Sequence, residues 1–163
     1  MNHLPVTERI SIRELIASDT DTLFQMYSDK EAMKFRGSKP FETREEVEKL
    51  LTEINQKIKM GSEFRYGIIL KETNQLVGTY LYAPISNTHC KVGLSFCKSF
   101  WGLGLGTEVM QIMTSYLKDL GYKTLVGYIS PQNFPSLKMI EKLNFERQNH
   151  SEYPEYLKYE KSI

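Results

Sequence analysis

The sequence predicts a mixed α/β (α+β) fold built on one central sheet. β-rich runs and amphipathic helical segments alternate in the order strand, two helices, three strands, helix, strand, helix and one or more final strands. The chain has 163 residues, which is long enough for a single domain over 1–163 with a core of its own. An apolar fraction of 40% and a charged fraction of 25% are typical of a globular protein.

The first strand and helix are predicted from short patterns near the N-terminus. Apolar residues alternate loosely through "RISIREL" (9–15), as they do in a half-buried strand. Ser18 precedes a short amphipathic segment over 19–29, which predicts a helix. A glycine and a proline interrupt the pattern in "KFRGSKPF" (34–41), so this stretch is predicted to be a loop.

The second helix has clear signals at both ends. Thr43 and Glu46 have the spacing of a capping box, and Gly61 is a natural helix stop. The apolar residues between them fall on one face at helical spacing: Val47, Leu50, Leu51, Ile54 and Ile58.

The remaining elements follow from the same periodicities. Two β-rich runs flank "ETNQ" (72–75), which predicts a hairpin. Further patterns predict a strand over 91–96, a helix that ends at Gly121, a strand over 123–130, a helix over 133–143 and a last strand over 155–162. Tyr153, Tyr156 and Tyr159 are expected to lie in a strand of mixed exposure near the acceptor end.

Composition argues against several classes of protein. A formal net charge of +1 argues against direct nucleic-acid binding. No secretory leader and no apolar run of roughly 20 residues are visible, so no membrane partner is expected. Cys90 and Cys97 are read as free thiols in a reducing cytoplasm, which predicts a cytoplasmic protein. The three histidines are too scattered to suggest a metal site.

Three glycines at alternate positions, Gly102, Gly104 and Gly106, precede the helix that ends at Gly121. Neither a dinucleotide fingerprint nor a Walker loop fits their spacing and flanking residues. A helix N-terminus offers unpaired N–H groups to an anion, and glycines let phosphate oxygens approach the backbone. This segment therefore predicts a diphosphate site, and the alternative is a flexible turn that binds nothing.

Two motifs resemble one enzyme family. "WGLGLGTEVMQ" (101–111) is similar to the acetyl-CoA-binding segment of the GNAT N-acetyltransferases, Q/R-x-x-G-x-G/A. "NFPSLKMIEKLNF" (133–145) is similar to the later N-x-x-S-x-x-x-x-x-K-L-G-F segment of that family. Segments 9–29 and 74–82 resemble the branch that contains the ribosomal-protein-alanine N-acetyltransferases. The resemblance implies the GNAT fold, a mostly antiparallel mixed sheet that splays between two strands and is flanked by about four helices.

The resemblance also implies an activity. Acetyl-CoA would be the cosubstrate, with no metal, and acetyl would pass to a primary amine by direct attack in a ternary complex. The N-terminal amine of a ribosomal or other protein is the acceptor that this branch suggests. A drug or polyamine N-acetyltransferase and a catalytically silent acyl-CoA-binding or sensor domain stay open as alternatives. A monomer and a homodimer are equally compatible.

The family motifs place the cofactor on particular residues. By resemblance, the backbone of Leu94, Ser95 and Phe96 pairs with pantetheine and polarises the thioester carbonyl. The diphosphate is expected on Trp101, Gly102, Leu103, Gly104, Leu105, Gly106 and Thr107. Asn133 is expected to cap its helix and to bond the pantetheine amide, with Ser136 beside it.

The catalytic groups depart from the family pattern. Many relatives carry a proton-donating tyrosine where this chain has Ile140. In the branch that this chain resembles, a serine at the position of Ser136 is proposed to protonate the departing thiolate, so the resemblance makes Ser136 the candidate. The alternative is a first-turn serine with no catalytic role. The branch often carries an acid where this chain has Lys91, so no general base can be assigned. His89 and Glu108 are read as a loop residue and as a helix-terminal charge.

Two further expectations concern a turn and the acceptor side. Asn144 replaces the glycine of the family's L-G-F, and asparagine accepts the left-handed backbone that such a turn requires. By family analogy, Phe35, Arg36 and Tyr66 are candidates to line the acceptor cleft.

Overall fold

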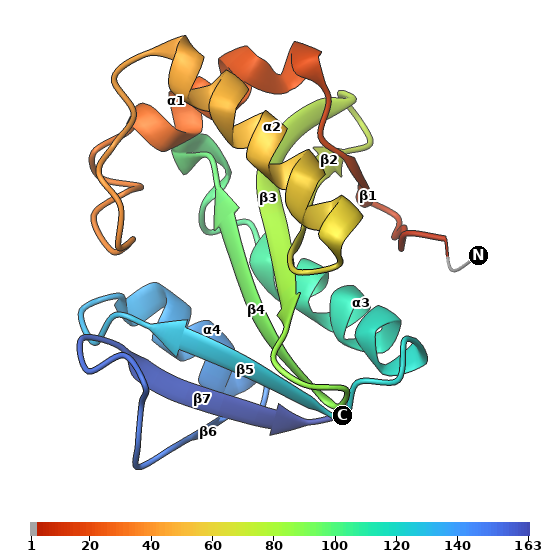
Figure 1. Ribbon diagram of the computed structural model, residues 1–163, viewed down its shortest axis with the longest axis vertical. Coiled ribbons are helices and arrows are strands. Elements are labelled where there is room, and N and C mark those ends of the chain that lie inside the picture. The colour runs from red at the N-terminus through yellow and green to blue at the C-terminus, as the bar shows by residue number, and fades with distance from the viewer. Residues whose placement is uncertain (1–2) are drawn as a thin grey trace.

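The computed structural model describes residues 3–163 and contains one seven-stranded sheet with the order β1-β2-β3-β4-β5-β7-β6 (Figure 1). The elements are β1 (Ile10–Glu14), α1 (Thr20–Ser28), α2 (Arg44–Met60), β2 (Phe64–Leu70), β3 (Gln75–Pro84), β4 (His89–Phe96), α3 (Leu105–Asp119), β5 (Thr124–Ile129), α4 (Phe134–Lys142), β6 (Glu146–Arg147) and β7 (Leu157–Ser162). This order confirms the predicted sequence of strands and helices. Short 3-10 turns at Ala17–Asp19 and Lys98–Phe100 were not predicted.

The sheet is mixed, as predicted, because one pair of neighbouring strands is parallel. The strands β4 and β5 run parallel, whereas all other neighbours are antiparallel. The parallel pairing is short: it covers His89–Lys91 of β4 and Thr124–Val126 of β5. Beyond Lys91 and Val126 the two strands separate, as Figure 1 shows. This separation confirms the predicted splay of the sheet.

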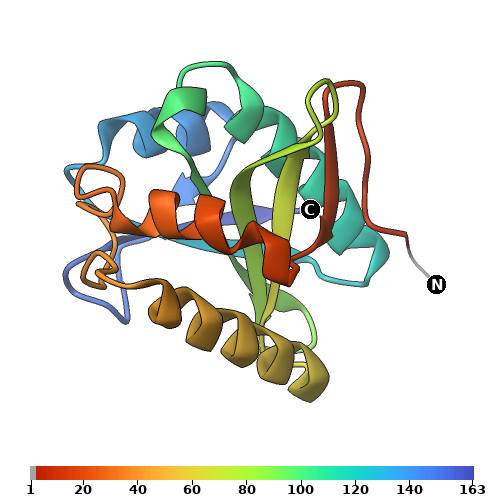
Figure 2. The same cartoon turned by 90° about the horizontal axis from the view of Figure 1, so that it is seen from above.

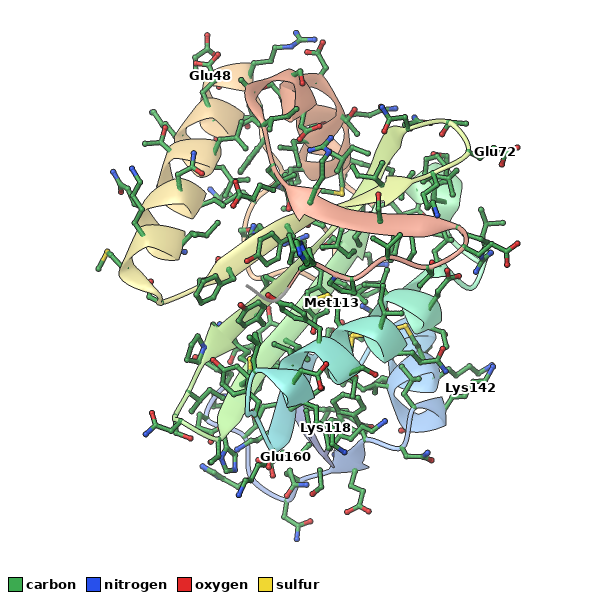
Figure 3. All side chains as sticks on the ribbon, turned by 90° about the vertical axis from the view of Figure 1, so that its right-hand side faces the viewer. Glu48, Glu72, Met113, Lys118, Lys142 and Glu160 are labelled. Carbon is green, nitrogen blue, oxygen red and sulfur yellow. The ribbon has the colours of Figure 1, made fainter. Side chains whose placement is uncertain are left out.

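Helices cover both faces of the sheet (Figure 2). On one face, α3 and α4 contribute Val109, Met113 and Ile140 to a large apolar cluster. On the other face, α1 and α2 contribute Leu23 and Val47 to a second cluster. Figure 3 shows Met113 on the sheet side of α3, whereas Lys118 and Lys142 point outward. The apolar stripes read from the sequence therefore face the sheet.

The helix ends follow the predicted local chemistry. The Glu46 carboxylate accepts the N–H of Thr43 at 2.9 Å, which satisfies an otherwise unpaired donor at the start of α2. Gly61 ends this helix with φ of 67°. After α4, Asn144 takes φ of 61°, so the predicted left-handed turn is confirmed. No helix in residues 3–163 has the length and apolar character needed to cross a bilayer.

An ion pair between a partly exposed arginine and a buried aspartate joins β1 to the turn before α1. Both guanidinium nitrogens of Arg13 donate to Asp19, at 2.7 and 2.8 Å, and the Ile16 N–H donates to the same carboxylate at 2.9 Å. Burial alone would raise the pKa of Asp19, but the hydrogen bonds lower it below its ordinary value of 3.8. Ionised Asp19 therefore stabilises the fold above this ordinary pKa, and the contribution is lost as the pH falls through the lowered value.

We expect Asp19→Asn to lower the free energy of unfolding at neutral pH by about 1 kcal/mol, because the partly exposed Arg13 loses its charged partner, an effect that solvent screening reduces. Urea denaturation at neutral pH and again below the lowered pKa of Asp19 measures the effect. The difference from wild type should shrink in acid. Asp21→Asn is the matched control, since the Asp21 side chain is 79% exposed in its pair with Arg44 and should contribute little. A loss at neutral pH that matches the control would contradict the expectation.

Candidate functional site

A cavity of about 820 Å³ opens where β4 and β5 separate. Its wall comes from β4, the glycine-rich loop, the start of α3, the end of β5, α4 and the loop between α1 and α2. Every residue predicted for the cofactor lies in this wall: Leu94, Ser95, Phe96, Trp101, Gly102, Leu103, Gly104, Leu105, Gly106, Thr107, Asn133 and Ser136. The structure thus brings together two sequence motifs that lie far apart in the chain.

The three glycines serve two different purposes. Gly102 and Gly104 have φ of 75° and 76°, a backbone region that glycine enters without strain. Gly106 lies inside α3, where an added Cβ would come within 3.0 Å of the Met139 sulfur. Two glycines therefore shape the loop, and the third allows α3 and α4 to approach each other.

The loop delivers backbone N–H groups to the cavity. Gly104 precedes α3 and its carbonyl accepts the first helical bond, from the N–H of Glu108 at 3.2 Å. By helix geometry, the N–H groups of Leu105, Gly106 and Thr107 have no partner within the helix. Together with the positive end of the helix dipole, they form a site suited to phosphate oxygens.

Two side chains hold this loop in place. The indole N–H of Trp101 donates to the Phe96 carbonyl at 3.0 Å, which ties the loop to the end of β4. Arg9 donates to the Leu103 carbonyl at 3.1 Å from the start of β1. Sequence reasoning missed Arg9, and no local signal could have found it, because the two residues are 94 positions apart.

Glu108 belongs to the same anchor. Its carboxylate accepts from the Arg9 Nε at 2.7 Å and from the Thr7 hydroxyl. Burial would raise the pKa of Glu108, but these hydrogen bonds and the Arg9 charge lower it. An ionised carboxylate held in this way fastens the N-terminal segment to α3, which agrees with its interpretation as a helix-terminal charge.

The edge of β4 provides a second set of backbone groups. Leu94, Ser95 and Phe96 pair with β3 on one side, opposite Tyr80, Thr79 and Gly78. On the other side, no strand within residues 3–163 pairs with this part of β4. An extended ligand that carries amide groups could add its hydrogen bonds along this edge.

The second motif caps α4 beside the cavity. The Asn133 Oδ1 accepts the N–H of Ser136 at 3.3 Å, so the predicted cap is confirmed. The Asn133 amide nitrogen retains two donors for another partner. Ser136 is half-buried in the cavity wall, and its hydroxyl bonds to no other residue in 3–163. Ile140 is buried in the same wall, so it presents hydrocarbon where many relatives carry a tyrosine.

Neither cysteine is equipped to form an acyl-enzyme. Both thiols are buried and unpaired by disulfide. Burial raises the pKa of Cys90 to about 12 and also raises that of Cys97, so both stay protonated at neutral pH. His89 does not line the cavity. Its Nδ1 lies 3.0 Å from the Thr88 hydroxyl.

We expect the intact mass of the protein to stay unchanged after incubation with acetyl-CoA alone, because buried protonated thiols are poor nucleophiles. Mass spectrometry under denaturing conditions, without reductant, tests this. A variant with Cys90→Ala and Cys97→Ala should keep its turnover within about two-fold of wild type. Detection of acetylated Cys90 or Cys97 would contradict direct transfer.

A different set of residues forms the wall on the α1–α2 side. Phe35 and Arg36, the candidates for the acceptor cleft, line the cavity, and Arg36 donates to the Ser95 hydroxyl. The expectation for Tyr66 is wrong: its side chain is only 7% exposed, packs in the core and does not reach the cavity. Its ring lies near that of Tyr82, with 6.3 Å between centroids.

The tyrosine-rich segment near the C-terminus also differs from its expectation. Tyr153 and Tyr156 lie in the loop before β7 and line the cavity, whereas Tyr159 lies in β7 and is buried. A hydrogen bond to β5 holds this loop, since the Tyr128 hydroxyl donates to Glu152 at 2.8 Å. The strand expected to contain all three tyrosines is therefore shorter than predicted, because β7 begins at Leu157.

Comparison with known proteins identifies the family. The family described as "Acetyltransferase (GNAT) domain" matches residues 9–146. The chain belongs to this family and is a GNAT N-acetyltransferase. Members of the family use acetyl-CoA.

Individual relatives agree with this assignment. An uncharacterized N-acetyltransferase, p20, from Bacillus licheniformis is 29% identical over 145 residues, which cover 87% of this chain and 82% of the relative. A GNAT-family acetyltransferase structure from Bacillus anthracis has a TM-score of 0.83 at 21% identity and covers 99% of this chain and 98% of its own. A ribosomal L7/L12 alpha-N-protein acetyltransferase in complex with coenzyme A has a TM-score of 0.83 at 19% identity, covering 98% and 97%.

Proposed function

We propose that this chain binds acetyl-CoA in the cavity between β4 and β5 and transfers the acetyl group directly to a primary amine. One observation carries the proposal. The sheet opens beyond Lys91 and Val126, and the N-terminus of α3 with its glycine loop stands at that opening. The loop suits a diphosphate, and the free edge of β4 suits the amide-containing arm that follows it.

In the proposed position, each motif binds a different part of the cofactor. The amides of residues 101–107 receive the diphosphate, with Arg9 holding the loop from outside. The pantetheine arm extends along Leu94–Phe96, and Asn133 bonds one of its amides with the donors that the helix cap leaves free. The thioester then lies between β4 and α4, within the part of the wall that contains Ser136.

The reaction proceeds by attack of the neutral amine nitrogen on the thioester carbonyl carbon. A backbone N–H of β4 stabilises the oxyanion of the tetrahedral intermediate. The carbon–sulfur bond then breaks, the thiolate takes the Ser136 hydroxyl proton, and solvent returns a proton to Ser136. The amine nitrogen loses its extra proton to solvent, because no residue of the wall is assigned as a base.

The acceptor that we favour is the N-terminal amine of a ribosomal or other protein. The solved coenzyme A complex with a TM-score of 0.83 is named as a ribosomal-protein N-acetyltransferase, which supports this class. A drug or polyamine acceptor is the main alternative. Replacement of the family's acid by Lys91 and of its tyrosine by Ile140 favours a different alternative, a silent acyl-CoA sensor.

A thiol-release assay distinguishes these functions. Acetyl-CoA is supplied with small amines, a polyamine, an aminoglycoside and a peptide that begins with alanine, and free coenzyme A is measured. Calorimetry measures the affinity of coenzyme A in parallel. We expect both binding and turnover. Binding without turnover across the panel would indicate a sensor, and absence of binding would overturn the site itself. Heat protection by ATP or NAD equal to that by coenzyme A would point to another ligand.

A further inference from the structure

Two cationic side chains in the cavity wall form no ion pair with an acidic residue in the described part of the chain, residues 3–163. They are Arg36, from the loop after α1, and Lys91, from β4. None of the ion pairs formed within residues 3–163 involves either of them. Among those residues, one carboxylate lines the cavity, that of Glu31, and it is already paired with Lys98. The wall therefore has an excess of positive charge before any ligand binds.

Arg36 is held in a fixed orientation. Its Nη1 donates to the Ser95 hydroxyl, and its guanidinium stands over the Tyr27 ring at 4.9 Å from the centroid. A guanidinium has five N–H donors in a planar fork, so most of them stay available to a ligand. The residue is half-buried, and a partly desolvated cation without a counter-ion favours an anionic ligand.

Lys91 marks the point where the strands part. It is the last residue of β4 that pairs with β5, opposite Val126. Its half-buried side chain also lines a smaller neighbouring cavity, of about 260 Å³, together with Glu152. The Glu152 oxygens accept from Lys158 and from the Tyr128 hydroxyl, each at 2.8 Å, so that carboxylate is already bound by other donors.

Both cations are associated with one face of β4, because Lys91 belongs to that face and Arg36 contacts Ser95 on it. Side chains alternate along a strand, so Lys91 and Ser95 share one face, while Leu94 and Phe96 share the other. Leu94 and Phe96 pack near Gly106 at the start of α3. The glycine loop and the two cations are thus on opposite sides of β4. Lys91 and Ser95 are about 13 Å apart along the strand, so the cations flank the length of the opening.

We propose that the acceptor carries a carboxylate close to its reactive amine, that Arg36 binds this carboxylate, and that Lys91 adds positive charge to the same wall without contacting it. This proposal rests on the proposed acetyltransferase function. The planar fork of Arg36 matches a carboxylate with two parallel hydrogen bonds. Polyamines and aminoglycosides are disfavoured, because they would add positive charge next to two unpaired cations. The carboxylate has two possible sources, an acidic residue near a peptide N-terminus and the α-carboxylate of a free amino acid.

Matched acceptors test the proposal. One peptide begins Ala-Asp-Glu and its partner begins Ala-Asn-Gln, while alanine and alaninamide form the second pair and spermidine is a cationic reference. We expect the carboxylate-bearing member of at least one pair to have a kcat/KM about ten-fold above its neutral partner. The peptide pair tests the first source of the carboxylate, and the alanine pair tests the second. Equal values in both pairs, or a preference for spermidine, would overturn the proposal.

Variants assign the effect to the two cations. Arg36→Met should remove the preference by raising KM for the carboxylate acceptor, while Arg36→Lys should retain part of it. Lys91→Met should have a smaller effect of the same kind. Lys34→Met is the matched control: Lys34 belongs to the same loop, lies 5.5 Å from the Phe35 ring centroid and is outside the cavity wall. The control should keep the preference.

Binding measurements separate this proposal from the underlying function. Calorimetry of coenzyme A with each variant should give an affinity within two-fold of wild type. If Arg36→Met instead weakens coenzyme A about ten-fold, the cation serves the cofactor and the proposal is wrong. The affinity of each acceptor for the coenzyme A-saturated protein is measured as well. A protein that shows the carboxylate preference in binding but no turnover would refute the enzymatic function and leave the recognition intact.

Discussion

Replacing Gly104 with valine is expected to weaken coenzyme A binding about 100-fold, which corresponds to about 2.7 kcal/mol. Gly104 has φ of 76°, a region that a β-branched residue occupies only with strain. An added Cβ would also stand 3.8 Å from the Arg9 Nη2, next to the contact that holds the loop. The backbone would shift, and the N–H groups of the first turn of α3 would no longer be directed at the proposed diphosphate.

Calorimetry with coenzyme A measures this loss, and Gly61→Val is the matched control. Gly61 also has a left-handed backbone, with φ of 67°, but it caps α2 and an added Cβ would meet nothing within 4 Å. Both variants carry a comparable backbone penalty in stability, whereas only Gly104→Val alters the loop. Unchanged coenzyme A affinity in a folded Gly104→Val protein would refute the diphosphate site.

Removing the hydroxyl of Ser136 is expected to lower kcat about 100-fold. Ser136→Ala leaves the backbone N–H that Asn133 caps, so α4 keeps its start and the affinity for coenzyme A should stay within two-fold. The chemical step is expected to slow, because the thiolate must then leave without a nearby proton donor. Steady-state kinetics with saturating acetyl-CoA and acceptor measure the effect.

Two further variants determine whether the loss belongs to this hydroxyl. Ser130→Ala removes another serine hydroxyl from the same cavity wall and should leave kcat nearly unchanged. Ser136→Thr keeps a hydroxyl at the position and should recover part of the rate. If Ser136→Ala has wild-type kcat, Ser136 is only a first-turn residue of α4 and the proton comes from elsewhere.

The sequence was sufficient for the elements whose signals are local. The apolar stripe of α2, the capping pair Thr43 and Glu46, and the glycine stop at Gly61 all act within a few residues, and all are present. The same holds for Asn133 at the start of α4 and Asn144 after its end. Where a motif combined local chemistry with family resemblance, its residues converged on one cavity.

The contacts that complete the site could not be predicted from the sequence, because they join residues that are far apart in the chain. Arg9 reaches Leu103 across 94 positions, and Arg36 reaches Ser95 across 59. Nothing in the sequence near Arg9 distinguishes it from a solvated surface residue, and Arg36 was named by family analogy without its contact to Ser95. The expectations for Tyr66 and for the extent of the last strand were also wrong. Tyr66 was chosen by family analogy, and tyrosines spaced by three are compatible with a strand and with a structured loop, so only tertiary packing decides where each ring lies.

The short register between β4 and β5 has a mechanical consequence. Within the sheet that residues 3–163 form, three residue pairs join the four N-terminal strands to the three C-terminal strands: His89–Thr124, Cys90–Leu125 and Lys91–Val126. If the cofactor arm lies along the free edge of β4, it supplies main-chain hydrogen bonds where β4 and β5 no longer pair. The affinity for the cofactor and the association of the N-terminal strands with the C-terminal strands would then be thermodynamically linked. Substitutions that weaken this association would therefore weaken cofactor binding even where they do not contact the cofactor.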